Sequence, residues 1–582
     1  MRRSILAALL AIIAAPATAA PGDDLKQVLD EHWAWYLRNN PVIATTVGVR
    51  TYDDQLGSAS LADLDRQAAE AGGFAKRLEA IPNAGLSPDQ RVDKAIVLRA
   101  LTEQVEANGF GERMMNLSTL GSWFTFLPEL GNIVPLRTGA DYRSYLTRLE
   151  QVPAFNDQQL AIAGEAVRRG FVQPCVTLTT MERQITGVVP ADATTSRFYA
   201  PFAKPKPFDM SAADWSAMQS RAKAVIADRI APAYARTAAF FRGTYLPKCR
   251  QSVGIAALPE GQRYYAFLVG QQTTTDLTPE AIHRLGLSEV KRIGAEMDAL
   301  AKKAGYASRA AFVAKLRTDP AYYPKTGAEL MAAAALQAKA IDGKMPSLFA
   351  TLPRLPYGVR AIPAAEAEGN TTAYYMPGAP EAGIAGTYYV NLSKLDQRPF
   401  WELPALTAHE AVPGHHHQIA LQQEIDLIPY RRHAAFFTAY VEGWGLYAEH
   451  LGIELGLYDT PEKDMGRLSY EMWRACRLVV DTGLHAKGWT KERAVAFMKE
   501  NSALTDANID AEVNRYITNP GQALAYKLGE LKFKELRARA EKALGPKFDV
   551  RRFHDAVLAP GAVPLDTLEA TADAWVAAET RK

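Results

Sequence analysis

The chain has few cysteines, no surplus of one charge and no long hydrophobic run after its first twenty residues. Its 582 residues include three cysteines, and 66 basic residues nearly balance 64 acidic ones. A net charge of +2 provides no basic surface of the kind that nucleic acids require, so we expect no nucleic-acid partner. No later stretch is long and apolar enough to predict a membrane span. The sequence also lacks Gly-x-Ser-x-Gly, so nothing supports a serine hydrolase of that type.

The first twenty residues have the features of a secretory signal peptide. Two arginines precede an apolar run from Ile5 to Ala15, and the small residues Ala17, Thr18 and Ala19 follow. The run is too short to anchor the chain across a bilayer. We therefore expect residues 1–20 to be cleaved and the mature protein to be periplasmic or secreted.

The three cysteines of an exported chain meet an oxidising compartment, where one disulfide bond can form. Because three is an odd number, at least one of them is free or pairs with another chain. Cys476 lies in an apolar helical stretch of the expected catalytic half and is most simply a buried small residue. We therefore predict that any disulfide joins Cys175 to Cys249.

Most of the mature chain has the apolar spacing of helices. This spacing is clear in five segments, at residues 23–40, 61–81, 89–107, 212–246 and 278–305. Residues 352–398 are instead rich in Tyr, Val and Thr and are interrupted by Pro and Gly, which indicates a small sheet. We predict a mostly α protein, with an N-terminal helical region at 21–270 and a catalytic region at 271–582 that contains the sheet.

Four of the ten histidines lie between positions 409 and 417, in the segment HEAVPGHHH. Zinc hydrolases carry His-Glu-x-x-His on one helix, so that both imidazoles reach one metal and the glutamate acts as general base. Here His409 and Glu410 supply the first half, but the next histidines are His415 and His416. A regular helix places the seventh residue about 10 Å along its axis, too far to share an ion. The helix must therefore bulge.

The residues between the histidines can produce that distortion. Pro413 removes a helical hydrogen bond, and Gly414 permits backbone angles that other residues avoid. Looping out these two residues makes His415 the second ligand, whereas His416 requires three residues to be displaced. On a regular helix His416 shares a face with His409, so it stays the alternative ligand and is otherwise a neighbour of the ligands.

The third ligand is expected on the helical segment 434–452. Glu442 lies there among large apolar residues, where a glutamate is costly unless it is paired or bound to a metal. Gly443 and Gly445 flank it and let a neighbouring backbone approach closely. Glu449, two turns later, is the candidate partner of a ligand histidine. With two histidines, Glu442 completes the three-ligand set of a catalytic Zn2+ site.

The segment 470–489 places Arg477, Asp481 and His485 on one helix face. Such residues often form an exposed ladder of ion pairs that contributes little to stability. Alternatively, Asp481 holds His485 in the active site, where the histidine donates to the oxyanion. Either Arg477 or Arg474 is also a candidate for holding a substrate carboxylate.

Several motifs resemble a bacterial family known as domain of unknown function 885, namely NPVIATTVGVRTYDDQL, TPEAIHRLGLSEV, GTYYVN, HEAVPGHHHQ, EGWGLYAE, RLVVDTGLHAKGW and NPGQALAYKLG. The resemblance covers nearly the whole mature chain. That family is grouped with the gluzincin metallopeptidases, such as thimet oligopeptidase and angiotensin-converting enzyme. The grouping implies a large helical clamshell with a deep cleft. It also implies zinc ligands at His409, a later histidine and Glu442, with Glu410 as base.

The related peptidases imply three further roles. One is a downstream tyrosine that stabilises the tetrahedral intermediate, for which Tyr526 is a better candidate than Tyr516. Another is an edge strand beside the His-Glu helix that holds the substrate backbone, so that GTYYVN would present Tyr389 and Asn391. Finally, the closing ligand usually follows a glycine, which favours His415.

We therefore expect a zinc-dependent peptidase that hydrolyses peptide bonds with Glu410 as general base. One alternative is a catalytically inactive metal- or peptide-binding protein of the cell envelope. The other is a metal-dependent hydrolase of a different amide or ester.

The leader can be tested directly. Protein recovered from the periplasm should begin near Ala20 or Pro21, because the small residues before them suit a signal peptidase. N-terminal sequencing measures this start, and periplasmic material that begins at Met1 contradicts the prediction.

Overall fold

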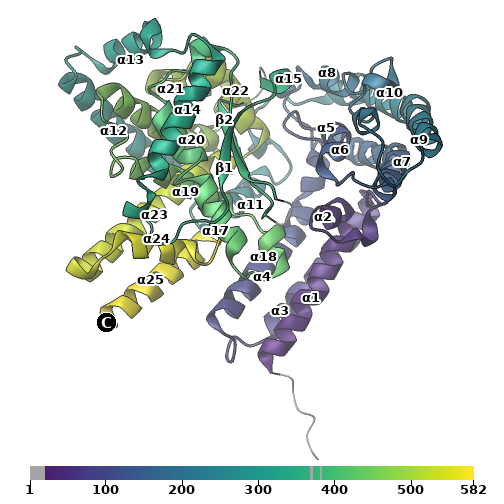
Figure 1. Cartoon of the computed structure of the whole chain (residues 1–582), viewed down its shortest axis with the longest axis horizontal. Coiled ribbons are helices and arrows are strands. Elements are labelled where there is room, and N and C mark those ends of the chain that lie inside the picture. The colour runs from purple at the N-terminus through teal and green to yellow at the C-terminus, as the bar shows by residue number, and fades with distance from the viewer. Residues whose placement is uncertain (1–19, 368–370, 381–382) are drawn as a thin grey trace, which may run out of the picture.

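A computed structural model describes residues 20–367, 371–380 and 383–582 of the chain (Figure 1). The expected leader therefore lies outside the described residues, apart from Ala20. Helices make up most of the described chain, and one small three-stranded sheet accompanies them. The predicted mostly α fold with a small sheet is confirmed, whereas the clamshell with a deep cleft stays a prediction.

The N-terminal part of the chain is helical throughout its described length. Its α-helices, purple and blue in Figure 1, are α1 (Pro21–Asn39), α2 (Pro41–Thr46), α3 (Leu61–Ala80), α4 (Pro88–Phe110), α5 (Trp123–Phe126), α6 (Leu130–Ile133), α7 (Gly139–Arg169), α8 (Met181–Thr186), α9 (Ala212–Val225) and α10 (Ala231–Phe240). Two π-helical segments, Ile226–Ile230 and Phe241–Tyr245, join α9 and α10 into the long helix expected at 212–246. The first precedes Pro232, whose missing amide hydrogen the wider turn accommodates.

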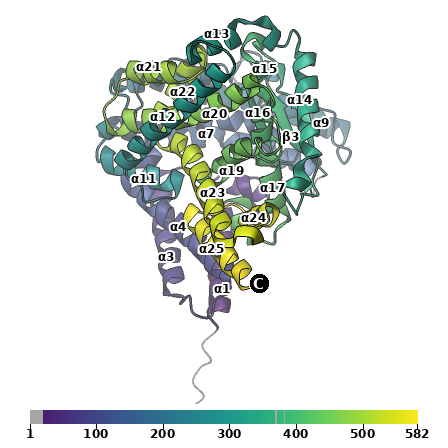
Figure 2. The same cartoon turned by 90° about the vertical axis from the view of Figure 1, so that its left-hand side faces the viewer.

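The rest of the chain, from α11 onwards, carries the histidine-rich segment. Its α-helices are α11 (Gly261–Thr273), α12 (Pro279–Lys303), α13 (Arg309–Thr318), α14 (Gly327–Asp342), α15 (Ala364–Ala367), α16 (Leu403–Glu410), α17 (His415–Glu424), α18 (Pro429–His433), α19 (Thr438–Leu451), α20 (Pro461–Ala486), α21 (Lys491–Asn501), α22 (Asp506–Thr518), α23 (Gln522–Leu544), α24 (Val550–Leu558) and α25 (Leu565–Arg581). The last helix ends at the same end of the molecule as α1, α3 and α4 (Figure 2).

The sheet contains β1 (Tyr357–Ala361), β2 (Ala373–Met376) and β3 (Gly386–Val390), in the order β1-β3-β2. β3 runs parallel to β1 and antiparallel to β2, so that Tyr388 lies opposite Val359 on one side and Tyr375 on the other. β2 contacts α16 and β3 contacts α17, which places the sheet beside the histidine-bearing helices. The expectation that GTYYVN forms an edge strand is wrong, because it forms the central strand and both of its edges are paired.

Helices α19 and α23 pack with their backbones almost in contact. A Cβ atom added to Gly443 would lie 2.4 Å from the Cα of Gly529. A Cβ atom added to Gly529 would lie 1.8 Å from the carbonyl oxygen of Ala439. Only glycine permits this approach. The contact sets the position of Glu442 on α19 relative to Tyr526 on α23.

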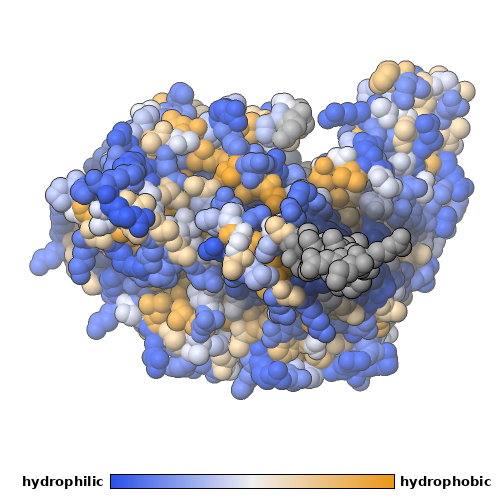
Figure 3. Space-filling view, turned by 90° about the horizontal axis from the view of Figure 1, so that it is seen from below, coloured by the Kyte–Doolittle hydropathy of each residue, from blue (hydrophilic) through white to orange (hydrophobic). Residues whose placement is uncertain are grey.

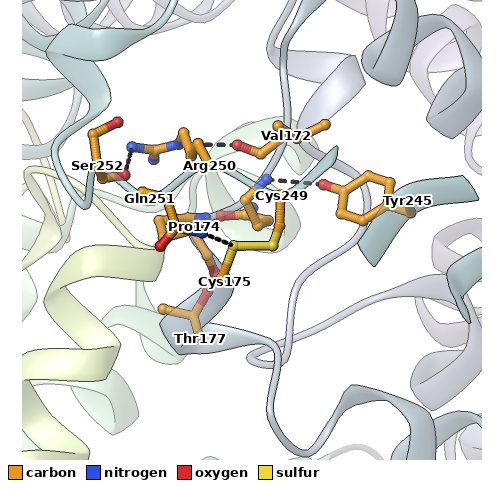
Figure 4. The surroundings of a disulfide bond; sticks show 10 residues. Val172, Pro174, Cys175, Thr177, Tyr245, Cys249, Arg250, Gln251 and Ser252 are labelled. Atoms are coloured by element: carbon orange, nitrogen blue, oxygen red, sulfur yellow. Dashed lines mark hydrogen bonds between the residues drawn. A yellow bond between two sulfur atoms is a disulfide. The ribbon is translucent and has the colours of Figure 1, made fainter. Parts of the chain in front are cut away.

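The predicted disulfide between Cys175 and Cys249 is confirmed, and Cys476 is a buried free cysteine (Figure 4). The amide of Cys175 donates to the carbonyl of Arg250, and the amide of Arg250 donates to the carbonyl of Gln173. The bonded cysteines are 74 residues apart. In the chain-entropy model, closing such a loop stabilises the fold by about 4 kcal/mol.

The surface carries hydrophilic residues over most of the face drawn in Figure 3, with apolar residues in separate patches. The most exposed large apolar side chains are scattered along the chain, for example Phe208, Leu336 and Phe436. Such scattered exposure is ordinary for a folded protein. Among the helices of the described ranges, none is long and apolar enough to cross a membrane.

The α19–α23 contact can be tested with a single methyl group. Gly529→Ala should lower the free energy of unfolding by about 1–3 kcal/mol, because the new Cβ atom overlaps the carbonyl of Ala439. The matched control is Gly164→Ala in α7, where no heavy atom lies within 4 Å of the added methyl. Alanine favours a helix, so this control should be neutral or slightly stabilising. Equal effects of the two changes in denaturant titrations would argue against the close contact.

Candidate metal centre

The segment that carries the histidines is a pair of helices separated by a break. α16 ends at Glu410 and α17 begins at His415, so the expected bulge is a full interruption of the helix. Ala411 leaves the helical region with φ −98° and ψ −106°, and the peptide bond before Pro413 is cis. The break contains Pro413 and Gly414, the two residues that were predicted to distort the helix.

Gly414 and Trp444 hold the break in place. A Cβ atom at position 414 would lie 1.9 Å from the carbonyl oxygen of His409, so only glycine fits there. The indole N–H of Trp444, on α19, donates to the carbonyl of Pro413 at 2.8 Å. The start of α17 is therefore folded against the end of α16.

The break brings together the three predicted ligands. Nε2 of His409 and Nε2 of His415 each lie 3.5 Å from Oε2 of Glu442. One donor atom from each of the three residues lies within 4.8 Å of the other two. The two imidazole rings are nearly perpendicular, with centroids 4.6 Å apart. Two imidazoles and one carboxylate form a donor set of catalytic zinc sites, so these residues fit a divalent metal ion.

A second carboxylate orients the first ligand. Nδ1 of His409 lies 2.8 Å from Oε1 of Glu449, the partner that the sequence suggested. A proton on Nδ1 is shared with that carboxylate, which leaves Nε2 free to bind a metal. Arg474 on α20 lies 3.3 Å from the same oxygen. Gly445 makes room for the ring, because a Cβ atom there would lie 2.7 Å from Cε1 of His409.

The electrostatics of the cluster favour a positive charge. Burial alone would lower the pKa of His409, but hydrogen bonds with Glu442 and Glu449 outweigh it and raise the pKa to about 9. Burial alone would raise the pKa of Glu442, but His409 and His415 hold it well below its usual range. A site that stabilises a positive charge among its donor atoms also has the negative electrostatic potential that a metal ion requires.

Glu410 directly follows the first histidine of this cluster. It is the last residue of α16 and is partly exposed, whereas both ligand histidines are buried. The charge of Glu410 also raises the pKa of His409, although burial and the two hydrogen bonds have larger effects. A carboxylate beside the metal ligands and open to solvent has the position of a general base.

Tyr526 and Arg477 also lie near the cluster. Burial raises the pKa of Tyr526, and the charge of Glu442 raises it further. The guanidinium of Arg477 stacks on the rings of Tyr526 and Trp473, 4.4 Å from each centroid. Arg477 is 3% exposed, and its Nε donates to the hydroxyl of Tyr516. Its buried Nη1 has no hydrogen-bond partner within the described part of the chain.

His485 and Asp481 do not form the predicted oxyanion donor. Nε2 of His485 donates to the carbonyl of Tyr516 at 2.9 Å, and Nδ1 accepts the amide of Ile255 at 3.0 Å. Both ring nitrogens are therefore engaged inside the core. Asp481 accepts from the hydroxyl of Tyr265 and does not orient His485. The prediction is wrong because helical spacing defines a face of α20 without defining what packs against it.

The predicted substrate strand is also wrong. Asn391 is fully buried, its amide group donates to the carbonyl of Ala367, and its Oδ1 accepts the amide of Ser393. It therefore ties a loop to the end of β3. Tyr389 stacks on Tyr374 of β2, with centroids 5.0 Å apart. Because both edges of β3 are paired, this strand has no free backbone groups for a substrate.

His416 points away from the ligands. Its Nδ1 lies 2.9 Å from the hydroxyl of Tyr375 on β2, so His415 joins the cluster in preference to His416. The sequence did not identify Trp444 as a functional residue, although its indole N–H holds the break through Pro413. The available signal was its position between Gly443 and Gly445, two residues after Glu442.

The solved structures that are similar to this chain include two predicted lipoproteins. One is a predicted lipoprotein from Colwellia psychrerythraea, with 27% identity, a TM-score of 0.89, and coverage of 96% of this chain and 100% of that one. The other is a predicted lipoprotein of unknown function from Shewanella oneidensis, with 19% identity, a TM-score of 0.72, and coverage of 95% and 99%. No curated protein matches the chain. The model of the family described as bacterial protein of unknown function (DUF885) matches residues 41–571, and the chain belongs to that family.

Proposed function

We propose that this protein is an exported zinc-dependent peptidase of the gluzincin type. The observation that carries the proposal is the convergence of His409, His415 and Glu442 across a broken helix. Two histidines and a glutamate are a ligand set of zinc peptidases. Glu410, directly after the first ligand, matches the His-Glu half of their motif. The motifs that resemble gluzincin relatives support the same assignment.

The side chains around the cluster suit distinct roles in peptide hydrolysis. A bound zinc ion supplies Lewis-acid chemistry, because it polarises a carbonyl group and lowers the pKa of water. Glu410 removes a proton from the attacking water and passes it to the leaving amine. Glu449 keeps a proton on Nδ1 of His409, so that Nε2 stays available as a donor. From α23, the hydroxyl of Tyr526 donates to the oxyanion.

Arg477 has the chemistry to hold a carboxylate of the substrate. Nη1 of Arg477 lacks a hydrogen-bond partner among the described residues, although it is buried beside Tyr526. Nε donates to Tyr516 and Nη2 to Glu512, so Nη1 is the nitrogen that can donate to a substrate carboxylate. In this proposal Arg477 positions the substrate and takes no part in proton transfer.

Metal content distinguishes the two candidate second ligands. His415→Ala should weaken zinc binding by more than about 100-fold, because it removes a donor atom from the cluster. His416→Ala is the matched control and should keep zinc near the wild-type level, because His416 contacts Tyr375. Elemental analysis after dialysis against defined free zinc measures both. Zinc loss in His416→Ala but not in His415→Ala would reverse the assignment.

Turnover tests the role of Glu410. The zinc-loaded mature protein should cleave members of a peptide library, and a chelator should abolish cleavage. Glu410→Gln should retain zinc while turnover falls by about 100-fold or more, because the general base is lost. The control is Glu424→Gln, at the far end of α17, where Glu424 pairs with Arg354 on the surface. This control should cleave like the wild type.

The outcomes of that experiment separate the competing functions. Cleavage by Glu410→Gln at the wild-type rate rejects the proposed base. A zinc-loaded wild type that cleaves no peptide rejects the peptidase and leaves a binding protein or a hydrolase of another amide or ester.

A further inference from the structure

Two cavities meet between the N-terminal helices and the segments that lead into α19 and α23. The first, about 500 Å³ in volume, is lined by residues of α3, α4, α11 and the segment 434–437. The second, about 330 Å³, is lined by the short helix Glu112–Met115 with its following loop, by α11, and by Thr518–Pro520. Glu112 and Gln271 line both cavities. The two cavities therefore adjoin at these residues, and we call the pair the α4–α11 groove.

The α4–α11 groove passes the first turns of the helices that carry the metal centre. Phe437 lines the groove, and Glu442 follows it on α19 after a rise of about 7.5 Å. Pro520 lines the other part, and Tyr526 lies about 6 Å along α23 from its first residue, Gln522. An extended peptide advances about 3.3 Å per residue. A peptide in this groove therefore lies within a few residues of a bond held at the metal centre.

One acidic side chain in the groove lacks a cationic partner. Arg99 pairs with Glu103 at 2.7 Å, and Arg113 pairs with Asp65 at 2.6 Å. Within the described ranges, no side chain forms a hydrogen bond or ion pair with the carboxylate of Glu112. Burial raises the pKa of Glu112, because the groove wall shields it from water. A shielded carboxylate without a cation is costly, and a cationic ligand removes that cost.

Aromatic rings border this carboxylate. Tyr264 lies near Glu112, since burial and then the charge of Glu112 raise the pKa of Tyr264. Phe436 and Phe437 line the part of the groove nearest to α19, and Phe436 is 64% exposed. Ammonium and guanidinium groups bind favourably over aromatic rings. An unpaired acid beside such rings has the recognition chemistry for a lysine or arginine side chain or a free amino group.

We propose that the α4–α11 groove binds a segment of the peptide substrate and that Glu112 selects segments carrying an ammonium or guanidinium group. The identity of the ligand as a peptide rests on the proposed peptidase function. The groove thereby gives the N-terminal helices a role in substrate choice. Glu112 acts there as a specificity residue, separate from the residues that perform hydrolysis.

Equilibrium binding tests the groove apart from catalysis. The zinc-loaded Glu410→Gln protein is titrated with labelled decapeptides in which one lysine is moved along the chain and norleucine occupies the same position in the reference peptide. The best lysine peptide should bind at least about tenfold more tightly than its norleucine counterpart, and Glu112→Gln in the same protein should abolish this difference. Peptides with free and acetylated amino termini identify which cation Glu112 recognises.

A matched control tests whether the loss of any nearby negative charge weakens the preference for lysine. Glu106→Gln removes one negative charge from an exposed position of α4 that does not line the groove. It should retain the preference for lysine. A zero-length carbodiimide reaction on the Glu410→Gln protein provides a second measurement that leaves Glu112 intact. This reaction should join the peptide lysine to Glu112, as detected by mass spectrometry.

The outcomes distinguish this inference from the proposed function. A lysine preference that survives Glu112→Gln, or crosslinks that form only at other acids, would overturn the role of Glu112. A lysine preference that depends on Glu112, in a wild type that cleaves nothing, supports the groove and rejects the peptidase. Cleavage by a wild type without a Glu112-dependent preference rejects the groove alone.

Discussion

The structure around the three candidate metal ligands depends on a helix that stops between two of them. In an unbroken helix, six residues separate His409 from His415 by a rise of about 9 Å. The interruption brings their ring centroids to 4.6 Å. Gly414 lets the chain turn against a carbonyl that any side chain would strike, and Trp444 binds the turn through Pro413. The glycine at position 414 and the hydrogen bond from Trp444 to Pro413 therefore bring the two histidines together.

The third ligand depends on packing between helices. The sequence EGWG makes a different contact at each position: Glu442 faces the histidines, Gly443 lies against α23, and Gly445 admits the ring of His409. Because α23 approaches so closely, Tyr526 is held near the same carboxylate. The two glycines therefore help to set the positions of the three donor residues, since a methyl group at either glycine would displace a neighbour.

Charged side chains surround the candidate metal centre, some in contact with its histidines and some farther away. Glu449 holds His409, and Arg474 contacts Glu449, so the first ligand is oriented through two further side chains. Arg477 lies on the same helix as Arg474 but stacks on aromatic rings and keeps one buried nitrogen without a described partner. Farther away, Glu112 is an acid without a described cation in the α4–α11 groove. Arg477 is itself paired, because its Nη2 lies 3.1 Å from Glu512. Paired charges therefore orient the centre, whereas Glu112 has chemistry to offer a ligand.

The sequence by itself determined the helical class, the location of the sheet and the set of candidate donors, because these follow from periodicity, composition and the chemistry of side chains. It also led to His415, since the Pro-Gly insert is local. The sequence did not predict that β3 is the central strand or that both ring nitrogens of His485 are hydrogen-bonded. Strand order and helix packing depend on residues distant in the chain. Which donors meet was decided only by the tertiary structure, since bonds of about 2 Å require backbone positions that spacing along one helix does not define.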